Sequence, residues 1–344
     1  MELHSSGIVT YSDLPPGVDH KTFHRVYFPT IVQYLACQFN PWAIAPAQAI
    51  PIIQTAWDKI IPDVPYEITA SSVVYRLVSV LYTAHKFRLI KSILETMQHV
   101  ANTWHGPIGS SALMAIILFF RLHKDLYATD AERQEFTRWY LQHICFAWKH
   151  SDGDIPDISI VPFTSHLLTI HFSLQGMLRG SLMIQTFGTH LMAVNGTLKI
   201  DGIDDPDAPI GKPIGGLGLA AATIKWALTL IKDGVVTINA INYVNGKVPT
   251  LPKSVNATTS KESTAAVAFN DDMWGRQSQG FTKMVERVTQ STHQFENFEK
   301  VAKSHSKAHT RVWESIANSG MQDDDIDNEF AALTEQYNTD DDLD

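Results

Sequence analysis

The side chains best placed for chemistry in this sequence are the cations between Arg276 and Arg311. This stretch holds seven basic residues, three acidic residues and three histidines. Basic residues at this density bind anions, either the phosphates of a nucleic acid or the carboxylates of an acidic protein segment. The candidate binding residues for an anionic partner are Lys283, Arg287, Lys300, Lys303, Lys307 and Arg311. A solvated helix face without a partner is the simpler interpretation of the same charges.

The aromatic residues of this stretch bear on the kind of partner. Phe281, Phe295 and Phe298 follow the spacing of one helix face, which indicates packing rather than stacking on nucleic-acid bases. We therefore expect another protein as the partner, with nucleic acid of a mobile element or of chromatin as the alternative. A protein-binding scaffold would also show an exposed apolar patch, for which Phe295, Phe298 and Trp313 are candidates.

The end of the chain carries charge of the opposite sign. Residues Met321–Asp344 include ten Asp or Glu and no Lys or Arg. Because the whole chain has 27 bases and 36 acids, the 320 residues before this tail hold 27 bases and 26 acids. A segment so acidic and so poor in apolar residues is predicted to be disordered. Such a tail would compete with anionic partners for the basic helix, and salt would weaken the contact.

Fifteen histidines raise the question of a metal site. Helical metal ligands need i, i+3 or i, i+4 spacing together with a third ligand. His305 and His309 have this spacing, but the lysines around them would repel a dication. The H-E-x-x-H pattern does not occur in the sequence. We therefore expect neither a metal nor a cofactor.

A glycine pattern at 216–221 matches the dinucleotide fingerprint G-x-G-x-x-A. That fingerprint requires a strand before the first glycine and an acidic residue about 20 positions later. The preceding residues are instead a loop rich in Asp, Pro and Gly. The small residues therefore predict close helix packing and not nucleotide binding.

Catalytic patterns are equally weak. The G-x-S-x-G pattern of a nucleophile elbow does not occur in the sequence. Cys145 stands among aromatic residues at helical spacing, which predicts a buried thiol rather than a reactive one. We assign no catalytic residue. An enzyme with a site assembled near His190 and the loop Asp204–Asp207 remains the rival hypothesis.

Hydrophobic periodicity predicts that helices carry almost all of these residues. The predicted helices cover residues 50–60, 73–101, 110–123, 129–147, 217–231 and 277–317, with two more inside 163–193. Pro51 suggests that the first of them becomes regular only near that residue. Ser71 or Thr69 is the expected cap of the second, and Gly106-Pro107 is expected to end it.

Two helix ends carry specific signals. Thr129 and Glu132 have the spacing of a capping box, and Gly234 is placed to end the 217–231 helix. Asn245-Gly246 predicts a hairpin turn within 235–248. Residues 249–264 are polar and are predicted to form a loop.

These elements predict an all-α fold, a single large non-repeating helical globule with a loop-rich C-terminal third and a disordered acidic tail. The predicted organisation is an irregular arm over 1–20, a helical core over 21–234, a loop-rich segment over 235–275, a basic amphipathic helical segment over 276–318 and the acidic tail over 319–344.

Five stretches of the chain resemble a family of helical domains of unknown function that is expanded in mushroom-forming fungi, the basidiomycetes. These stretches are Pro41-Trp42 with Ala45–Trp57, Glu135-Phe136 with Tyr140-Leu141, Gly180–His190, Gly215–Gly234 and Phe269–Gly275. The resemblance rests on their order and spacing over about residues 23–300. It implies an α-rich fold and a fungal source, and it brings no activity, cofactor or catalytic residue. The polar insertion at 249–264 departs from the family pattern.

The remaining features concern location. Cys37 and Cys145 fit neither a disulfide framework nor a zinc spacing, which is typical of reduced thiols inside cells. The longest apolar run, Ala112–Phe120, has nine residues, whereas a membrane span needs about 20. The first residues lack the pattern of a secretory signal. We expect an intracellular protein of the cytoplasm or nucleus without a transmembrane segment, acting as a non-enzymatic interaction or scaffold module.

Overall fold

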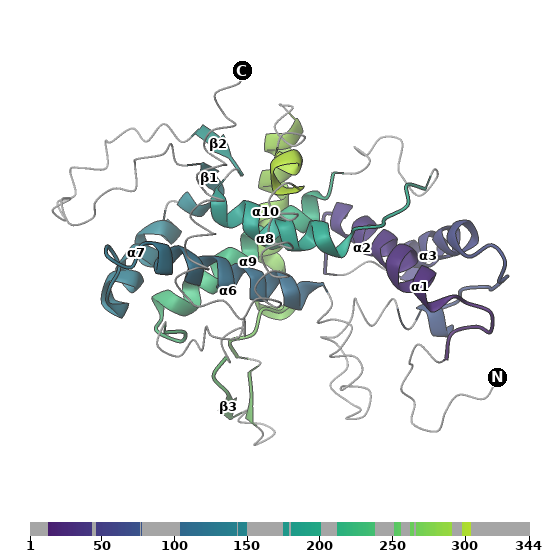
Figure 1. Ribbon diagram of the computed structural model, residues 1–344. Helices are drawn as coiled ribbons and strands as arrows, with labels where there is room; N and C mark the ends of the chain where they lie inside the picture. The colour runs from purple at the N-terminus through teal and green to yellow at the C-terminus, as the bar shows by residue number, and fades with distance from the viewer. Residues whose placement is uncertain are drawn as a thin grey trace, which may run out of the picture. The chain divides into compact units, whose positions relative to one another are not determined.

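The computed structural model describes residues 13–42, 46–75, 77, 104–142, 144–149, 175–178, 180–200, 212–237, 251–255, 262–264, 266–290 and 298–303. Over these ranges the chain is mainly helical (Figure 1). The all-α fold class is therefore confirmed. The helices are α1 (His20–Thr22), the π-helix η2 (Phe23–Tyr27), α2 (Phe28–Cys37), α3 (Pro46–Ile60), α6 (His105–Leu122), α7 (Asp130–Gln142), the 3-10 helix η3 (Cys145–Ala147), α8 (Ser181–Ala193), α9 (Ile214–Lys232) and α10 (Asp271–Gln290).

The strands are short and form two antiparallel pairs. β1 (Trp148–Lys149) pairs with β2 (Gln175–Met177), and β3 (Ser254–Val255) pairs with β4 (Glu262–Ser263). The second pair lies in the stretch 249–264, which was predicted to be a polar loop. The prediction missed these strands because two residues are too few to show a periodic pattern. The hairpin predicted at Asn245-Gly246 lies outside the described residues.

The chain divides into two compact units, each assembled from separate stretches of sequence. Unit 1 comprises Met1–Ser110, Thr189–Thr223 and Phe269–Phe295. Unit 2 comprises Ser111–Gly188, Ile224–Ala268 and Glu296–Asp344.

The core of unit 1 is built around Tyr27 of η2 and Trp57 of α3, which are both fully buried. Their rings meet edge-on with 5.5 Å between centroids. The Tyr27 hydroxyl donates to the carbonyl of Ile53 (3.1 Å), and Trp57 Nε1 donates to the carbonyl of Val64 (2.9 Å). Leaving either donor unpaired in the core would cost about 1–3 kcal/mol. These bonds therefore help to fix η2 against α3.

Two helices, α3 and α6, begin earlier than the prolines predict. α3 begins at Pro46 and continues through Pro51. Pro51 cannot bond to the carbonyl of Ala47, but both residues are exposed, so water can satisfy that carbonyl. α6 begins at His105 and holds Pro107 in its first turn, where a missing N–H costs no helical hydrogen bond.

A further helical turn begins at Val73. Its cap is Ser72, whose hydroxyl accepts from the Tyr75 amide (3.2 Å), rather than the predicted Ser71 or Thr69. Those two residues instead share a hydrogen bond between their hydroxyls (3.1 Å). Most of the predicted 73–101 helix lies outside the described residues.

The glycines at 216 and 218 bring helices of unit 1 close together. A Cβ on Gly216 would lie 3.0 Å from the Cβ of Ala36 in α2. A Cβ on Gly218 would lie 2.6 Å from the amide nitrogen of Thr282 in α10. The glycine pattern therefore serves helix packing, as predicted. α9 begins after the coil residues Lys212 and Pro213, and the residues before these lie outside the described ranges.

In unit 2, Phe136 of α7 lies at the centre of an aromatic cluster. Its ring is 5.2 Å from Phe119, 4.8 Å from Tyr127 and 4.9 Å from Tyr140, measured between centroids. The capping box that precedes α7 is confirmed, because Thr129 N donates to Glu132 Oε2 (2.8 Å) and Glu132 N donates to Thr129 Oγ1 (3.3 Å).

The predicted helix over 129–147 is too long. α7 ends at Gln142, and Ile144 has a φ of 54°, a left-handed conformation that an α-helix cannot continue through. Ala147 lies in η3 instead. The side chains of His143 and Cys145 lie outside the described set, so the predicted burial of the Cys145 thiol stays a prediction.

α9 is a core helix. It is long and apolar enough to cross a membrane, but 83% of its apolar window is buried within the protein. Gly234 ends the helix with a φ of 69°, and its amide donates to the carbonyl of Ile231 (3.0 Å). This left-handed glycine cap is the predicted one.

Candidate functional site

The basic segment predicted to begin near Gln277 is part of a helix that starts earlier. α10 begins at Asp271, and Asn270 caps it by accepting from the Met273 amide (3.0 Å). Asp271 and Asp272 occupy the first turn, where negative charge is favoured by the helix dipole. Sequence reasoning missed this start, although an Asn followed by two acids is a helix-start signal.

One side of α10 is packed into unit 1. Trp274, Phe281 and Val285 are buried on this side. The hydroxyls of Ser278 and Thr282 are buried too, and each donates to the backbone carbonyl four residues earlier (3.0 Å). Since the apolar groups are removed from water and these two hydroxyls are paired, this side holds the helix at a fixed rotation.

The opposite side of α10 carries Arg276, Lys283 and Arg287, all exposed. They are 7 and 11 residues apart, which places them within about 20° of one line along the helix and within about 16 Å of its length. We call these three residues the α10 cationic face. No ion pair joins any of them to a described residue.

Two residues border the α10 cationic face and add other properties. Met273 is 52% exposed, which offers an apolar contact beside the charges. Gly280 lies between the cations, and a Cβ placed on it would meet no atom within 4 Å. The surface is therefore open at its centre and mixes positive charge with one apolar side chain.

The other predicted binding residues follow α10 in the sequence. Lys300 and Lys303 are exposed on a helical segment at 298–303, which belongs to unit 2. Lys303 pairs with Glu299 (2.6 Å). The structure therefore brings together Lys283 and Arg287 of the predicted set and adds Arg276. Lys307 and Arg311 lie outside the described residues.

The phenylalanines of this region are packing residues where they are described. Phe281 is 8% and Phe298 is 2% exposed. This confirms the interpretation of their spacing for both residues. The exposed apolar patch predicted at Phe298 is wrong, because its ring packs 5.4 Å from that of Phe187. Phe295 and Trp313 lie outside the described residues.

A second group of polar side chains is enclosed in unit 1. Trp104 Nε1 donates to His190 Nδ1 (3.1 Å), and His190 is fully buried. The ring of His105 lies 4.5 Å from Trp42 and 4.6 Å from Trp104. These rings link α8, the start of α6 and the turn at Pro41-Trp42.

Burial sets the charge of both histidines. Desolvation lowers the pKa of His190 to about 3. It lowers the pKa of His105 to about 4, opposed by a hydrogen bond from His105 to the carbonyl of Pro41. Both imidazoles are therefore neutral at pH 7. For the rival enzyme hypothesis, the structure thus offers a buried neutral imidazole at His190, and the Asp204–Asp207 loop lies outside the described residues.

Metal ligands do not converge in the part of the chain that the structure describes. No group of three or more His, Cys, Asp or Glu side chains there could hold an ion. Cys37 is partly buried, and its sulfur accepts from Gln33 Nε2 (3.9 Å). The pair His305 and His309 lies outside this part.

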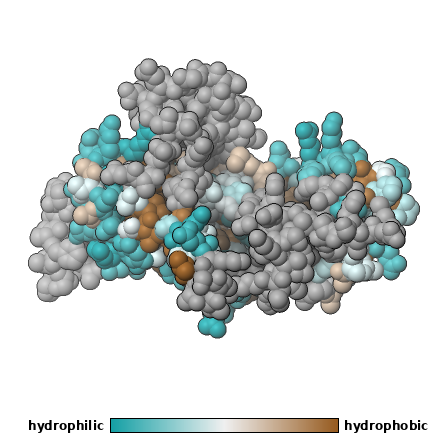
Figure 2. All heavy atoms as spheres, turned by 90° about the horizontal axis from the view of Figure 1, so that it is seen from below, coloured by the Kyte–Doolittle hydropathy of each residue, from teal (hydrophilic) through white to brown (hydrophobic). Residues whose placement is uncertain are grey.

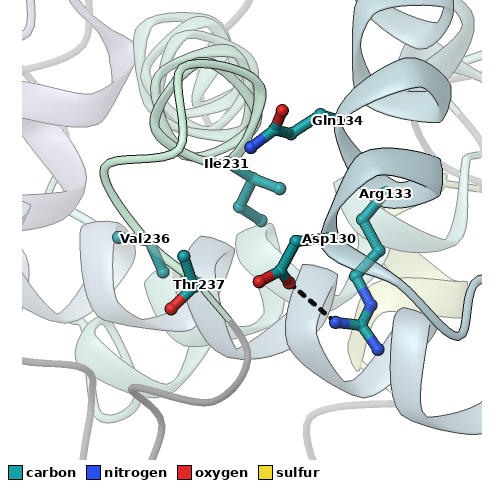
Figure 3. Close-up of a pocket in the computed structure, with 6 residues that line it drawn as sticks. All are labelled: Asp130, Arg133, Gln134, Ile231, Val236 and Thr237. Atoms are coloured by element: carbon teal, nitrogen blue, oxygen red, sulfur yellow. Dashed lines mark hydrogen bonds and ion pairs between the residues drawn. The ribbon is translucent and has the colours of Figure 1, made fainter.

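Unit 2 has a shallow depression between α7 and the end of α9. It is lined by Asp130, Arg133, Gln134, Ile231, Val236 and Thr237 (Figure 3). Arg133 lines one side of it (Figure 3), and its guanidinium binds Asp130 (2.8 Å) and the carbonyls of Tyr127 and Ala128 (2.9 and 2.8 Å). The depression leaves no room for a water-sized sphere, so we assign it a structural role.

Large hydrophobic side chains at the described surface are scattered. They are Phe39, Leu126, Ile144, Met192, Leu198, Val255 and Met273. On the face shown in Figure 2, the hydrophobic areas are small and stand among hydrophilic ones. Single exposed apolar residues are normal on protein surfaces, so charge is the more informative property of this surface.

Comparison of the chain with protein-family models, curated proteins and solved structures found no match. The resemblance to fungal helical domains therefore stays a prediction. The α10 cationic face is the candidate functional site on which the remaining inferences rest.

Proposed function

We propose that this chain is an interaction module that binds an acidic segment of another protein through the α10 cationic face. The observation that carries the proposal is the alignment of Arg276, Lys283 and Arg287 on the exposed side of a helix whose other side is packed. A fixed helix presents its charges without the entropy cost of ordering a loop. The partner therefore meets a preformed row of cations.

An acidic protein fits this surface better than a nucleic acid does. Nucleic-acid binding gains affinity from many phosphate contacts, about 6–10 in strongly salt-dependent cases. The α10 cationic face offers three cations, and the acids Asp272 and Glu286 flank them on the same helix. Phe281 is buried and cannot stack on bases. Met273 is instead suited to an apolar side chain of a protein partner.

The proposal predicts which class of probe the full chain binds. We would titrate the full chain with a labelled polyaspartate peptide of about 20 residues and with single- and double-stranded DNA and RNA, at about 50 and 200 mM salt. We expect polyaspartate to bind at low salt, to weaken at high salt and to bind more tightly than each nucleic acid. Tighter binding of a nucleic acid would overturn the proposal in favour of the nucleic-acid alternative.

Two matched sets of substitutions test whether polyaspartate binds at the α10 cationic face. Arg276→Gln, Lys283→Gln and Arg287→Gln together remove the three charges. The control changes Lys21, Arg25 and Lys59 to Gln, three cations that are also exposed in unit 1. Because each exposed pair contributes about 0.2–1 kcal/mol, we expect the first set to weaken polyaspartate binding about 3- to 160-fold and the control to leave it nearly unchanged. Equal loss in both sets would show only a general charge effect.

A further inference from the structure

The acidic end of the chain has a pattern that matches the α10 cationic face. Its acids begin with the run Asp323-Asp324-Asp325 and continue at Asp327 and Glu329. Apolar side chains stand among them at Ile326, Phe330, Leu333 and Tyr337, a spacing of 4, 3 and 4 residues that is typical of one helix face. The segment thus combines acids with an apolar stripe, where α10 combines cations with Met273.

We propose that the acidic segment Met321–Asp344 of the same chain occupies the α10 cationic face and that an external partner must displace it. This inference rests on the proposed function and adds its regulation. It also defines the partner chemically, because a successful competitor must offer a run of carboxylates with an apolar residue close by. The tail would carry the same chemical groups as that partner.

Chain length permits the contact. Seven residues join Gln290, the last residue of α10, to the helical segment 298–303. Seventeen residues then separate Lys303 from Met321, and when extended they reach up to about 60 Å, whereas α10 is about 30 Å long. The reach therefore allows the acidic segment to return to α10.

Attachment to the same chain makes a weak contact effective. Three exposed ion pairs strengthen binding only about 3- to 160-fold, which by itself corresponds to a dissociation constant of about 6 mM or weaker between separate molecules. A tethered segment acts at a local concentration on the order of millimolar. Burial of one apolar tail side chain against Met273 would strengthen the contact a further ten-fold or more. With both contributions, the tail can occupy the face for much of the time and still leave it when a better partner arrives. Segments that order on binding suit such exchange.

A photo-crosslink tests whether the tail reaches the face. In the full chain, Phe330→p-benzoylphenylalanine keeps an aromatic side chain and adds a crosslinker. We expect a product of monomer mass whose crosslinked peptide comes from α10. The yield should fall at least five-fold with Arg276→Glu, Lys283→Glu and Arg287→Glu, and stay unchanged with Lys21→Glu, Arg25→Glu and Lys59→Glu. A product only of dimer mass, or a crosslink outside α10, would overturn the proposal.

A double-mutant cycle separates this inference from the proposed function. One variant replaces the ten acids of Met321–Asp344 with Asn or Gln in the full chain. With α10 intact, we expect it to bind polyaspartate about ten-fold more tightly than the native chain. With the three α10 cations changed to Gln, tail neutralisation should have no such effect. Equal gains on both backgrounds would exclude occupation of the face while leaving the proposed function standing. Binding that never depends on α10 would remove the proposed function itself.

Discussion

A hydrogen bond from Trp104 orients the ring of His190 and determines its tautomer. The indole N–H of Trp104 can only donate, so Nδ1 of His190 must carry a lone pair. Burial lowers the pKa of His190 to about 3 and that of His105 to about 4. In the unfolded chain both would titrate near 6.5. The unfolded state therefore binds more protons than the folded state at mildly acidic pH.

This difference predicts a pH dependence of stability. The stability contributed by each neutral histidine is complete above about pH 6.5 and decreases as pH falls toward the folded pKa values of about 4 and 3. At pH 5 the expected loss is on the order of 2 kcal/mol for each histidine. Denaturant unfolding at pH 7, 6 and 5 measures it.

The variant His190→Asn provides the control for that measurement. The side-chain oxygen of Asn can replace Nδ1 as the acceptor for Trp104 and does not titrate. We expect this variant to be less stable than the native chain at pH 7 and to lose about half of the pH dependence. An unchanged loss between pH 7 and pH 5 would show that other groups cause the acid sensitivity.

Sequence patterns could not identify this pair of histidines. His190 and Trp104 are 86 residues apart, and neither stands in a motif that signals a hydrogen bond. The spacing of His305 and His309 did suggest metal ligands, but both residues lie outside the described residues. Tertiary packing decides whether a histidine is buried. A single sequence shows this only where the buried face of the helix is already known.

The helices of the chain were more predictable than their ends. Periodicity located α6, α9 and the basic helix, because buried stripes repeat every 3 or 4 residues. The errors came at the boundaries of α3, α6, α7 and α10. Proline position decides the first two, a left-handed residue the third and an Asn cap the fourth. These local features depend on exposure or on backbone conformation, neither of which periodicity records.

The capping box at the start of α7 gives a direct test of one such boundary. Thr129→Ala removes the oxygen that accepts from the Glu132 amide, and we expect it to lower the free energy of unfolding by about 1 kcal/mol. Thr55→Ala in α3 is the matched control, because Thr55 is exposed and its hydroxyl only bonds back to the Pro51 carbonyl. Thermal unfolding of both variants should separate them. Equal midpoints would mean that the box contributes nothing.

We expect a Gly→Ala substitution to change the free energy of unfolding in opposite directions at two positions. Gly218→Ala would place a Cβ 2.6 Å and 2.8 Å from backbone atoms of Thr282, so we expect a loss of about 1–3 kcal/mol from overpacking. Gly280→Ala meets open space and removes a flexible residue from α10, so we expect a gain of about 0.5–1 kcal/mol. Denaturant midpoints measure both. A stable Gly218→Ala variant would contradict the close contact of α9 with α10.

Across the chain as a single molecule, charge is separated rather than mixed. Ten acids are concentrated in the last 24 residues, and the other 320 residues are nearly neutral. Composition alone revealed this asymmetry and pointed to the basic segment. It could not tell which cations are exposed together, since that depends on which side of α10 is packed against unit 1. The structure selects Arg276, Lys283 and Arg287, of which Arg276 was not among the predicted binding residues.

A charge swap tests the interaction surface most directly. In the full chain with its tail acids neutralised, we would measure binding of polyaspartate and polylysine before and after Arg276→Glu, Lys283→Glu and Arg287→Glu. We expect the native face to prefer polyaspartate and the reversed face to prefer polylysine, each by at least ten-fold. Polyaspartate binding that survives the reversal would contradict the assignment of α10 as the binding surface.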